Sequence, residues 1–395
     1  MTQRLYYTDS YLAEFEATIL EVQPAPPQFR VYLDRTAFYP ASGGQPSDTG
    51  RIAEAAVVDV VDEGERMAHV VESDLNPGTA RCRLDWARRF DHMQQHTGQH
   101  LLSAAFVETL GRPTVSFHLG PEASTIDVEA GKLDGPQIEA VESRANAVVF
   151  ENRPVGARFC SHEEAASMDL RKPSDREGPI RVVEIAGYDR SACGGTHVRA
   201  TGEIGPILIR RLDRVRQTVR VEFLCGRRAA RRARADFDAL SRVAKLFSAP
   251  LDQAPSLVAA QMEGAQSAEK ARQKLEAELA VFKGRQLYAS TTPDSQGRRL
   301  YQTTQPAGSL DPARMLAQQF TSAGPDAIFL LAVQQPPTLL VAVSAGLAAH
   351  AGDLIRSVAG PLGGRGGGSA RLAQASFPDS EVVQQALRRL LAALG

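Results

Sequence analysis

The stretch HMQQHTGQHLLSAAFVETL, residues 92–110, decides the fold of this chain. Its apolar residues recur at helical spacing and predict a helix. They are Leu101, Leu102, Ala105, Phe106 and Leu110. Gly111 and Pro113 follow and are expected to end the helix. His96 and His100 are four residues apart, so both imidazoles project from one face, about one turn apart.

A second segment supplies matching ligands. Cys193-Gly194-Gly195-Thr196-His197 offers a thiolate and a third imidazole with the same four-residue separation, and its glycines allow the backbone to turn sharply. Two helical histidines alone are more often surface or core residues, but three imidazoles and one thiolate make a complete tetrahedral set for zinc. We therefore expect one zinc ion to be held by His96, His100, Cys193 and His197.

The same histidine spacing occurs in zincin proteases, and that class is excluded. A zincin needs a glutamate directly after the first histidine as its general base. Thr97-Gly98-Gln99 fills the gap between the two histidines here.

Length and charge limit the remaining classes. A chain of 395 residues predicts two or three domains. A formal net charge of -1 argues against a protein that simply coats nucleic acid. Residues 210–234 nevertheless contain many arginines and only two acidic residues, Asp213 and Glu222, which predicts a local basic surface. A solvated helix face would explain the same run of arginines. The arginines are Arg210, Arg211, Arg214, Arg216, Arg220, Arg227, Arg228, Arg231, Arg232 and Arg234.

Cysteine usage and hydropathy favour a cytoplasmic protein. Four cysteines are spread too thinly for the disulfide framework of a small secreted domain. They are Cys82, Cys160, Cys193 and Cys225. The N-terminal residues MTQRLYYTDSYLAEFEA have no basic region followed by an apolar stretch, and no run of about 18 apolar residues occurs. We expect a cytoplasmic protein with no membrane partner.

The pattern of elements predicts a multidomain α+β fold. Short alternating runs between proline and glycine turns suggest a small β-barrel at the N-terminus. A long helical stretch, broken near Pro250 and Pro255, suggests an arm or a coiled-coil-like pair. Two apolar strands, the glycine-rich loop GPLGGRGGGSA and a closing helix from about Ser380 suggest a small α/β domain. The predicted domains are a barrel at 1–88, the zinc-binding α+β domain at 89–225, the helical arm at 226–288 and the C-terminal domain at 289–395.

Four motifs carry a resemblance to a known family. FYPASGGQPSDTG (38–50), DHMQQHTGQHLLSAAF (91–106) and ACGGTH (192–197) resemble the signature stretches of the alanyl-tRNA editing family and of the editing domain in alanyl-tRNA synthetase. GGRGGGSARLAQA (363–375) resembles the glycine-rich loop of the C-terminal domain attached to those synthetases and to phosphoesterases named for an Asp-His-His motif. Together the motifs span nearly the whole chain, in the family's order.

The resemblance implies a free-standing, zinc-dependent hydrolase of the long form. Its expected substrate is tRNA(Ala) mischarged with serine, and with glycine as a second candidate. It makes His96, His100, Cys193 and His197 the zinc ligands. The resemblance also makes Gly43 and Gly44 part of the pocket wall that helps to select serine. Composition alone favours a plain turn at these two glycines.

Polar residues shortly after the zinc helix line the amino-acid pocket of the related editing domains. The candidates here are Gln99, Thr114, Ser116 and His118. Gln99, beside a ligand, also counts with the four ligands as a catalytic candidate. A hydrogen bond within the fold would explain each of these residues equally well.

Several alternatives stay open at this point. A closed set of four protein ligands is typical of structural zinc, whereas catalytic zinc keeps one position free. Two rival functions are a non-catalytic, zinc-stabilised tRNA-binding protein and a threonyl-type editing deacylase that also removes serine. Amino-acid activation is not expected, because the chain starts at the editing barrel.

The C-terminal domain is expected to bind rather than to catalyse. Its glycine-rich loop lacks the GK[ST] ending of a P-loop, so nucleotide hydrolysis is not expected. The metal domain of the Asp-His-His phosphoesterases is absent as well. Two roles are left for this domain. One is contact with the tRNA backbone, and the other is formation of a homodimer through the helical arm and the C-terminal domain.

Overall fold

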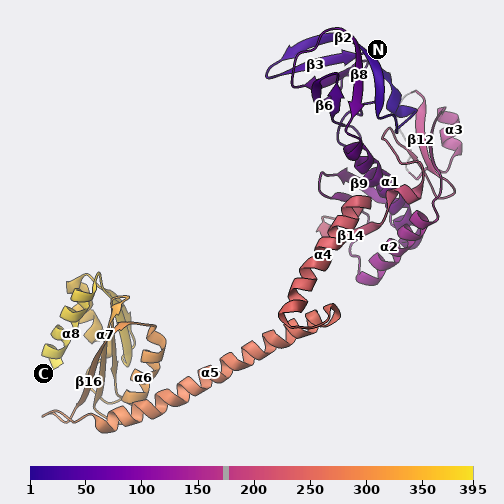
Figure 1. Cartoon of the computed structure of the whole chain (residues 1–395). Helices are drawn as coiled ribbons and strands as arrows, with labels where there is room; N and C mark the ends of the chain where they lie inside the picture. Colours follow the sequence, from indigo (N-terminus) through magenta and orange to yellow (C-terminus); the bar gives the residue numbers. More distant parts are fainter. Residues whose placement is uncertain (172–177, 395) are drawn as a thin grey trace. The chain divides into compact units, whose positions relative to one another are not determined.

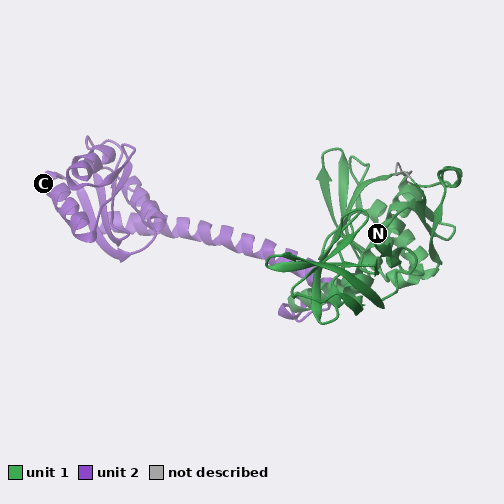
Figure 2. Ribbon diagram, turned by 90° about the horizontal axis from the view of Figure 1, so that it is seen from above, with its two compact units in different colours: residues 1–243 green, residues 244–395 purple. Residues whose placement is uncertain are grey.

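The structure is a computed structural model that describes residues 1–171 and 178–394. The chain divides into two compact units, residues 1–243 and residues 244–395 (Figure 2). Helices and strands are mixed in both, so the predicted multidomain α+β fold is confirmed. The predicted helical arm is divided at this boundary, since its first 18 residues, 226–243, belong to the first unit. The finer division into four domains stays a prediction.

A closed six-stranded barrel forms the N-terminal part of the first unit, as predicted (Figure 1). Around the barrel the strands follow the order β2-β3-β7-β6-β5-β8, and neighbouring strands are antiparallel. The strands are β2 (Glu14–Ala25), β3 (Gln28–Leu33), β5 (Gly50–Ile52), β6 (Ala55–Asp62), β7 (Met67–Val71) and β8 (Gly78–Leu84). Alternate residues of β2 enter the barrel, and Phe15, Ala17 and Ile19 are buried there.

Helix α1 (Trp86–Leu110) is the predicted histidine-bearing helix. The Asp85 side chain accepts a hydrogen bond from the Arg88 amide and caps its start, and Gly111 ends it in the left-handed conformation. Every residue from 92 to 106 is buried. The predicted C-terminal boundary is confirmed, and the helix lies in the interior of the first unit.

Two sheets and a second helix enclose α1. The four-stranded sheet has the order β14-β15-β10-β9, and the three-stranded sheet has the order β11-β12-β13. Their strands are β9 (Thr114–Leu119), β10 (Ser124–Val128), β11 (Val155–Cys160), β12 (Ile180–Ile185), β13 (Asp189–Ala192), β14 (Ile207–Val215) and β15 (Thr218–Cys225). The helices are α2 (Gly135–Phe150), α3 (His162–Ser167) and α4 (Gly226–Leu246). A Cβ at Gly98 would lie 2.2 Å from Cys225 Sγ, so only glycine lets α1 pack this closely on β15.

The second unit contains a five-stranded sheet of order β16-β17-β18-β20-β19 (Figure 1). Its strands are β16 (Arg299–Ala307), β17 (Ala327–Gln335), β18 (Thr338–Val343), β19 (Arg365–Gly368) and β20 (Leu372–Ser376). Its helices are α5 (Ala254–Ser290), α6 (Leu310–Ser322), α7 (Ala351–Ala359) and α8 (Ser380–Leu394). Among the residues that the structure describes, no helix is long and apolar enough to cross a membrane.

One local expectation was wrong and another was confirmed. Part of the expected glycine-rich loop is strand β19, an edge strand paired with β20. A Cβ at Gly366 would lie 2.1 Å from the Gln374 carbonyl oxygen, so glycine permits this close strand pairing. The predicted break near Pro250 and Pro255 is confirmed: α4 ends at Leu246 and α5 begins at Ala254, with Pro255 in its first turn, where proline costs no hydrogen bond.

A buried ion pair fixes the barrel on α1. The side chains of Arg89 and Asp48 are 0% and 1% exposed, and Arg89 Nε lies 3.1 Å from both carboxylate oxygens. The same guanidinium donates to the carbonyls of Ser10 (2.8 Å) and Ala37 (2.5 Å). Asp48 also accepts a hydrogen bond from the Tyr39 amide. One side chain of α1 therefore holds three chain segments of the barrel.

Replacing Arg89 by methionine tests this joint. The Arg89→Met variant leaves Asp48 buried without its partner, so we expect the free energy of unfolding to fall by about 3–5 kcal/mol. Urea unfolding can be followed through Trp86, the one tryptophan of the chain, which lies on α1. Arg112→Met, at an exposed position just after α1, is the matched control and should change stability little. Equal losses in the two variants would contradict this role of the ion pair.

Candidate metal centre

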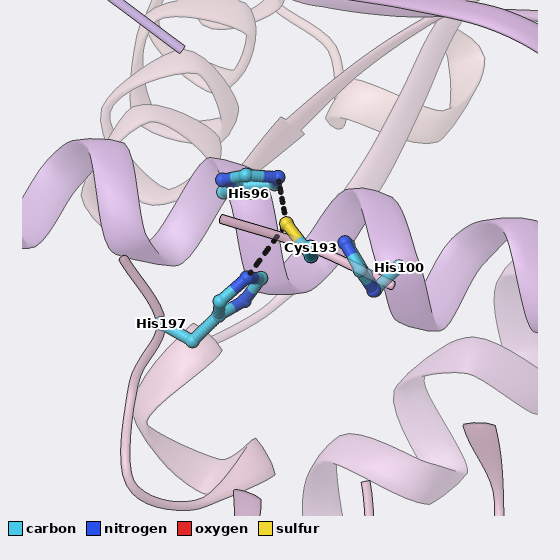
Figure 3. Close-up of side chains that lie close together, drawn as sticks. All are labelled: His96, His100, Cys193 and His197. Atoms are coloured by element: carbon cyan, nitrogen blue, oxygen red, sulfur yellow. Dashed lines mark hydrogen bonds between the residues drawn. The ribbon is translucent and has the colours of Figure 1, made fainter. Parts of the chain in front are cut away.

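The structure brings the four predicted zinc ligands together. His96 and His100 project from α1, while Cys193 and His197 lie on the loop that follows β13 (Figure 3). One ligand atom from each residue lies within 4.8 Å of all the others. The histidines are buried, and Cys193 is partly exposed. Their assignment as zinc ligands stays a prediction.

The distances around Cys193 fit a tetrahedral metal site. Its Sγ lies 3.4 Å from His96 Nε2 and 3.4 Å from His197 Nε2. Zinc binds nitrogen at about 2.0–2.1 Å and sulfur at about 2.3 Å, which puts neighbouring tetrahedral ligands about 3.5 Å apart. The donor set and these separations therefore fit zinc.

The outer nitrogens of the three imidazoles meet fixed partners. His96 Nδ1 lies 2.8 Å from Gln45 Oε1, and His197 Nδ1 lies 3.1 Å from Thr97 Oγ1. His100 Nδ1 lies 3.4 Å from Asp189 Oδ2, an ionic contact that is not aligned as a hydrogen bond. A proton on Nδ1 leaves the Nε2 lone pair free for a metal, so these partners favour the ligating tautomer.

Gln45 joins the barrel to the ligand loop. Besides contacting His96, its Oε1 accepts the Thr196 amide at 3.1 Å, and its Nε2 donates to Thr196 Oγ1 at 2.8 Å. The Arg181 guanidinium, on β12, holds the other side of the loop by donating to the carbonyls of Cys193 (2.8 Å) and Gly195 (2.9 Å). The loop is thus fixed from two elements that are distant in sequence.

Sequence reasoning missed these supporting residues. Gln45 lies inside a quoted motif, but the residue types alone do not reveal that its amide reaches His96. Thr97, Arg181 and Asp189 had no signal in a single sequence, because their partners come from other elements.

Charge at the cluster favours a metal ligand. Burial alone would raise the pKa of the Cys193 thiol, but the imidazoles of His96 and His197 outweigh it and hold that pKa well below its usual value. Burial opposes protonation of His100, yet the contacts with Asp189 and Cys193 raise its pKa to about 9, so this imidazole must lose a proton to bind a metal. Burial lowers the pKa of His197 to about 3. A thiolate and a neutral imidazole are the forms that bind zinc.

A small cavity of about 40 Å³ opens beside the cluster. Its volume is enough for about three water molecules. The lining residues are Tyr6, Tyr7, Tyr39, Pro40, Ser42, Gly43, Asp62, His96, Cys193, Gly194 and Gly195. Tyr6 is only 1% exposed, and its hydroxyl has no hydrogen-bond partner within residues 1–171 and 178–394. The cavity is therefore lined by a residue with an unpaired, buried hydroxyl and by two of the four candidate ligands.

The two glycines of the barrel motif form a tight turn. Gly43 and Gly44 have φ of 55° and 81°, and Ser42 and Gln45 exchange backbone hydrogen bonds of 3.1 Å and 3.0 Å. Gly43 also lines the cavity, whereas a Cβ at Gly44 would lie 2.8 Å from the Phe117 ring. Gly43 can therefore both form the turn and line the wall of the cavity. The role of both glycines in selecting serine stays a prediction.

The other predicted pocket residues do not line this cavity, and their role stays a prediction. The described lining of the cavity includes none of Gln99, Thr114, Ser116 and His118. Gln99 and Thr114 both donate to the Ser103 hydroxyl at 2.9 Å, and Ser116 donates to Asp127 at 2.6 Å. His118 is exposed on β9. The register of β9 turns Phe117 toward His96 instead, with ring centres 5.8 Å apart.

Comparison with known proteins assigns two segments of the chain. The family described as "Threonyl and Alanyl tRNA synthetase second additional domain" matches residues 180–222, which contain Cys193 and His197. The DHHA1 domain matches residues 300–395.

The relatives fall into two kinds, alanine–tRNA ligases and alanyl-tRNA editing proteins. The alanine–tRNA ligase of Pyrococcus abyssi is 30% identical over 99% of this chain and 43% of its own length. The alanyl-tRNA editing protein Aarsd1 of Mus musculus is 37% identical over 51% of this chain and 53% of its own length. The chain thus spans about half the length of these two relatives. The alanyl-tRNA editing protein AlaX-L of Pyrococcus horikoshii is 29% identical over 99% of this chain and 98% of its own length.

Fold, cluster and matches together define the class. The chain is a multidomain α+β protein in which residues 180–222 match the second additional domain of the threonyl and alanyl tRNA synthetases, and in which three histidines and a cysteine are gathered at one point. Within that class it is similar along its whole length to an alanyl-tRNA editing protein, and the resemblance to that family is confirmed.

Adding one methyl group at Gly195 tests the packing of the cluster. A Cβ there would lie 2.1 Å from His96 Cε1 and 2.4 Å from His96 Nδ1, so the imidazole must move. We expect Gly195→Ala to lower zinc affinity by about tenfold or more, measured by competition with a chromogenic chelator. Gly131→Ala, where the Cβ meets nothing within 4 Å, is the control. Unchanged affinity in Gly195→Ala would contradict His96 as a ligand.

Proposed function

We propose that this protein hydrolyses the ester bond of seryl-tRNA(Ala), with glycyl-tRNA(Ala) as a second candidate substrate. One observation carries the proposal: a His₃Cys cluster borders a small cavity of about 40 Å³. The names of the relatives support it, since Aarsd1 and AlaX-L are both alanyl-tRNA editing proteins.

The physical need for such a reaction comes from size. An enzyme that activates alanine cannot exclude the smaller glycine, and it rejects serine by only about 10²-fold, because its pocket must discriminate against a single added hydroxyl. A second hydrolytic site can do better if it hydrogen-bonds that hydroxyl. Alanine would then leave the polar groups of the site unpaired, and discrimination of about 10⁴-fold becomes attainable.

The chain's residues would divide the work as follows. His96, His100, Cys193 and His197 would hold the zinc, while Gln45 and Thr97 keep two imidazoles in the ligating tautomer. Bound zinc supplies a Lewis acid that can polarise the ester carbonyl or orient the substrate amine. Gly194 and Gly195, which have no side chains, border the cavity and let the ester approach the cluster. The ester is already activated, so positioning by these residues supplies much of the catalysis.

We propose that the Tyr6 hydroxyl binds the polar side chain of serine. It lies at the cavity, is buried and has no partner in the described part of the chain. A buried polar group without a partner costs about 1–3 kcal/mol, which a hydroxyl of the substrate would relieve.

Tyr6→Phe tests this assignment. The variant keeps the ring and loses the hydrogen bond, so kcat/KM for seryl-tRNA(Ala) should fall by about tenfold or more, while that for glycyl-tRNA(Ala) stays near the wild-type value. Tyr188→Phe is the control, because the Tyr188 hydroxyl is also buried but Tyr188 does not line the cavity. If both substrates lose activity equally, Tyr6 does not select serine.

A panel of four substrates tests the function itself. We expect purified protein to deacylate seryl-tRNA(Ala), to deacylate glycyl-tRNA(Ala) more slowly, and to leave alanyl-tRNA(Ala) and seryl-tRNA(Thr) intact. Cys193→Ala should lose zinc and deacylation together, since it removes a ligand. Preference for seryl-tRNA(Thr) would identify a threonyl-type deacylase. Binding of tRNA(Ala) without any hydrolysis would identify a non-catalytic RNA-binding protein.

The second unit would contribute binding or assembly. Helix α5 leaves several large apolar side chains exposed, which supports a homodimer formed through this helix. They are Val258, Met262, Leu275, Leu279 and Phe282.

A further inference from the structure

A large groove lies in the first unit where α1 and α4 begin. Its volume is about 790 Å³, and it shares no described lining residue with the cavity beside the cluster. The lining residues are Pro46, Ala87, Arg88, Asp91, His92, Pro121, Arg227, Arg228, Ala230 and Arg231. The groove thus combines four arginines with proline and alanine surfaces.

The charge of the groove is positive. Arg228 is buried and paired with Asp91, with 2.6 Å between the closest atoms. Arg227 and Arg231 are exposed, and within the described part of the chain neither forms an ion pair. Both α1 and α4 direct their N-termini, the positive ends of their dipoles, to this region. Two free guanidinium groups are therefore available to an anionic ligand.

His92 adds an independent sign that a ligand binds here. Its side chain lines the groove and is only 4% exposed, yet Nδ1 has no hydrogen-bond partner among residues 1–171 and 178–394. Buried polar atoms in proteins are nearly always hydrogen-bonded, so this unpaired nitrogen beside the groove is an unusual feature of the described residues.

The groove lies close to the cluster along α1. His92 and His96 are four residues apart on α1, which is about 6 Å along the helix. Pro46 directly follows Gln45, whose amide contacts His96. A polymeric ligand whose end is bound at the cluster must extend away from it, either past His92 and Pro46 or on another side of the cluster.

We infer that this groove binds the phosphodiester backbone of the RNA strand whose terminal ester enters the cavity. This inference rests on the proposed function, because that function supplies an RNA with its reacting bond at the end. Planar guanidinium groups match phosphate oxygens in pairs, which makes arginine the favoured residue for such contacts. Proline and alanine surfaces suit the apolar parts of sugar and base.

A charge-reversal pair tests the groove. In the full chain, Arg227→Glu with Arg231→Glu should weaken binding of uncharged tRNA(Ala) by about tenfold to 100-fold at moderate salt. The slope of log affinity against log salt should become shallower by about 1.4–1.8, for two lost phosphate contacts. The variant should raise KM for seryl-tRNA(Ala) while leaving kcat and zinc content near wild type, because the cluster is untouched.

Two comparisons make the result decisive. Arg112→Glu with Arg242→Glu changes the net charge equally at exposed positions outside the groove, and it should bind tRNA like the wild type. The minimal ester 3′-O-seryl-adenosine has no RNA strand, so wild type and groove variant should hydrolyse it alike. If the wild type hydrolyses neither ester, the proposed function fails. If it hydrolyses both, but the groove variant binds tRNA as tightly as the wild type or the control variant loses as much, the inference about the groove is overturned.

Discussion

The buried ion pair between Arg89 and Asp48 is the interaction on which the site depends. Both side chains are withdrawn from water, so each charge is tolerable only while the other stays in place. Arg89 belongs to the helix that carries His96 and His100, and Asp48 belongs to the barrel segment that also carries Gln45. Holding the two together lets Gln45 reach both His96 and the ligand loop. A joint made for stability thereby sets the geometry of the candidate metal centre.

That geometry explains why the main contribution of the protein to the proposed chemistry is to hold the reacting groups in position. The imidazoles are held from outside by Gln45, Thr97 and Asp189, and the ligand loop is held by Arg181. A cavity for a small group opens on one side of His96, and a positive groove lies one turn earlier on the same helix. Helix α1 thus connects the proposed place of bond cleavage with the place where we infer that the RNA strand lies.

Much of the fold could be predicted from sequence, because its signals are local. The spacing of Leu101, Leu102 and Phe106 indicated α1, and alternating runs between turns indicated the barrel. The four candidate ligands were recognisable because cysteine and histidine at a repeated spacing are chemically distinctive. The rest depends on tertiary contacts: the register of β9 turns Phe117 rather than Ser116 or His118 toward the cluster, and no local pattern could show that. Strand β19 was not predicted, because consecutive glycines are typical of a loop. They form a strand here because they pair with β20.

The central claim is that one zinc ion is bound by three imidazoles and one thiolate at the place where the ester is cleaved. X-ray absorption at the zinc edge, with and without a non-hydrolysable seryl-adenosine amide, tests it most directly. We predict one sulfur at about 2.3 Å and three nitrogens at about 2.0–2.1 Å, with a change in the light-atom shell when the analogue is added. A spectrum without a zinc–sulfur scatterer would contradict the ligand set, and an unchanged spectrum with saturating analogue would make the zinc structural rather than part of the reaction.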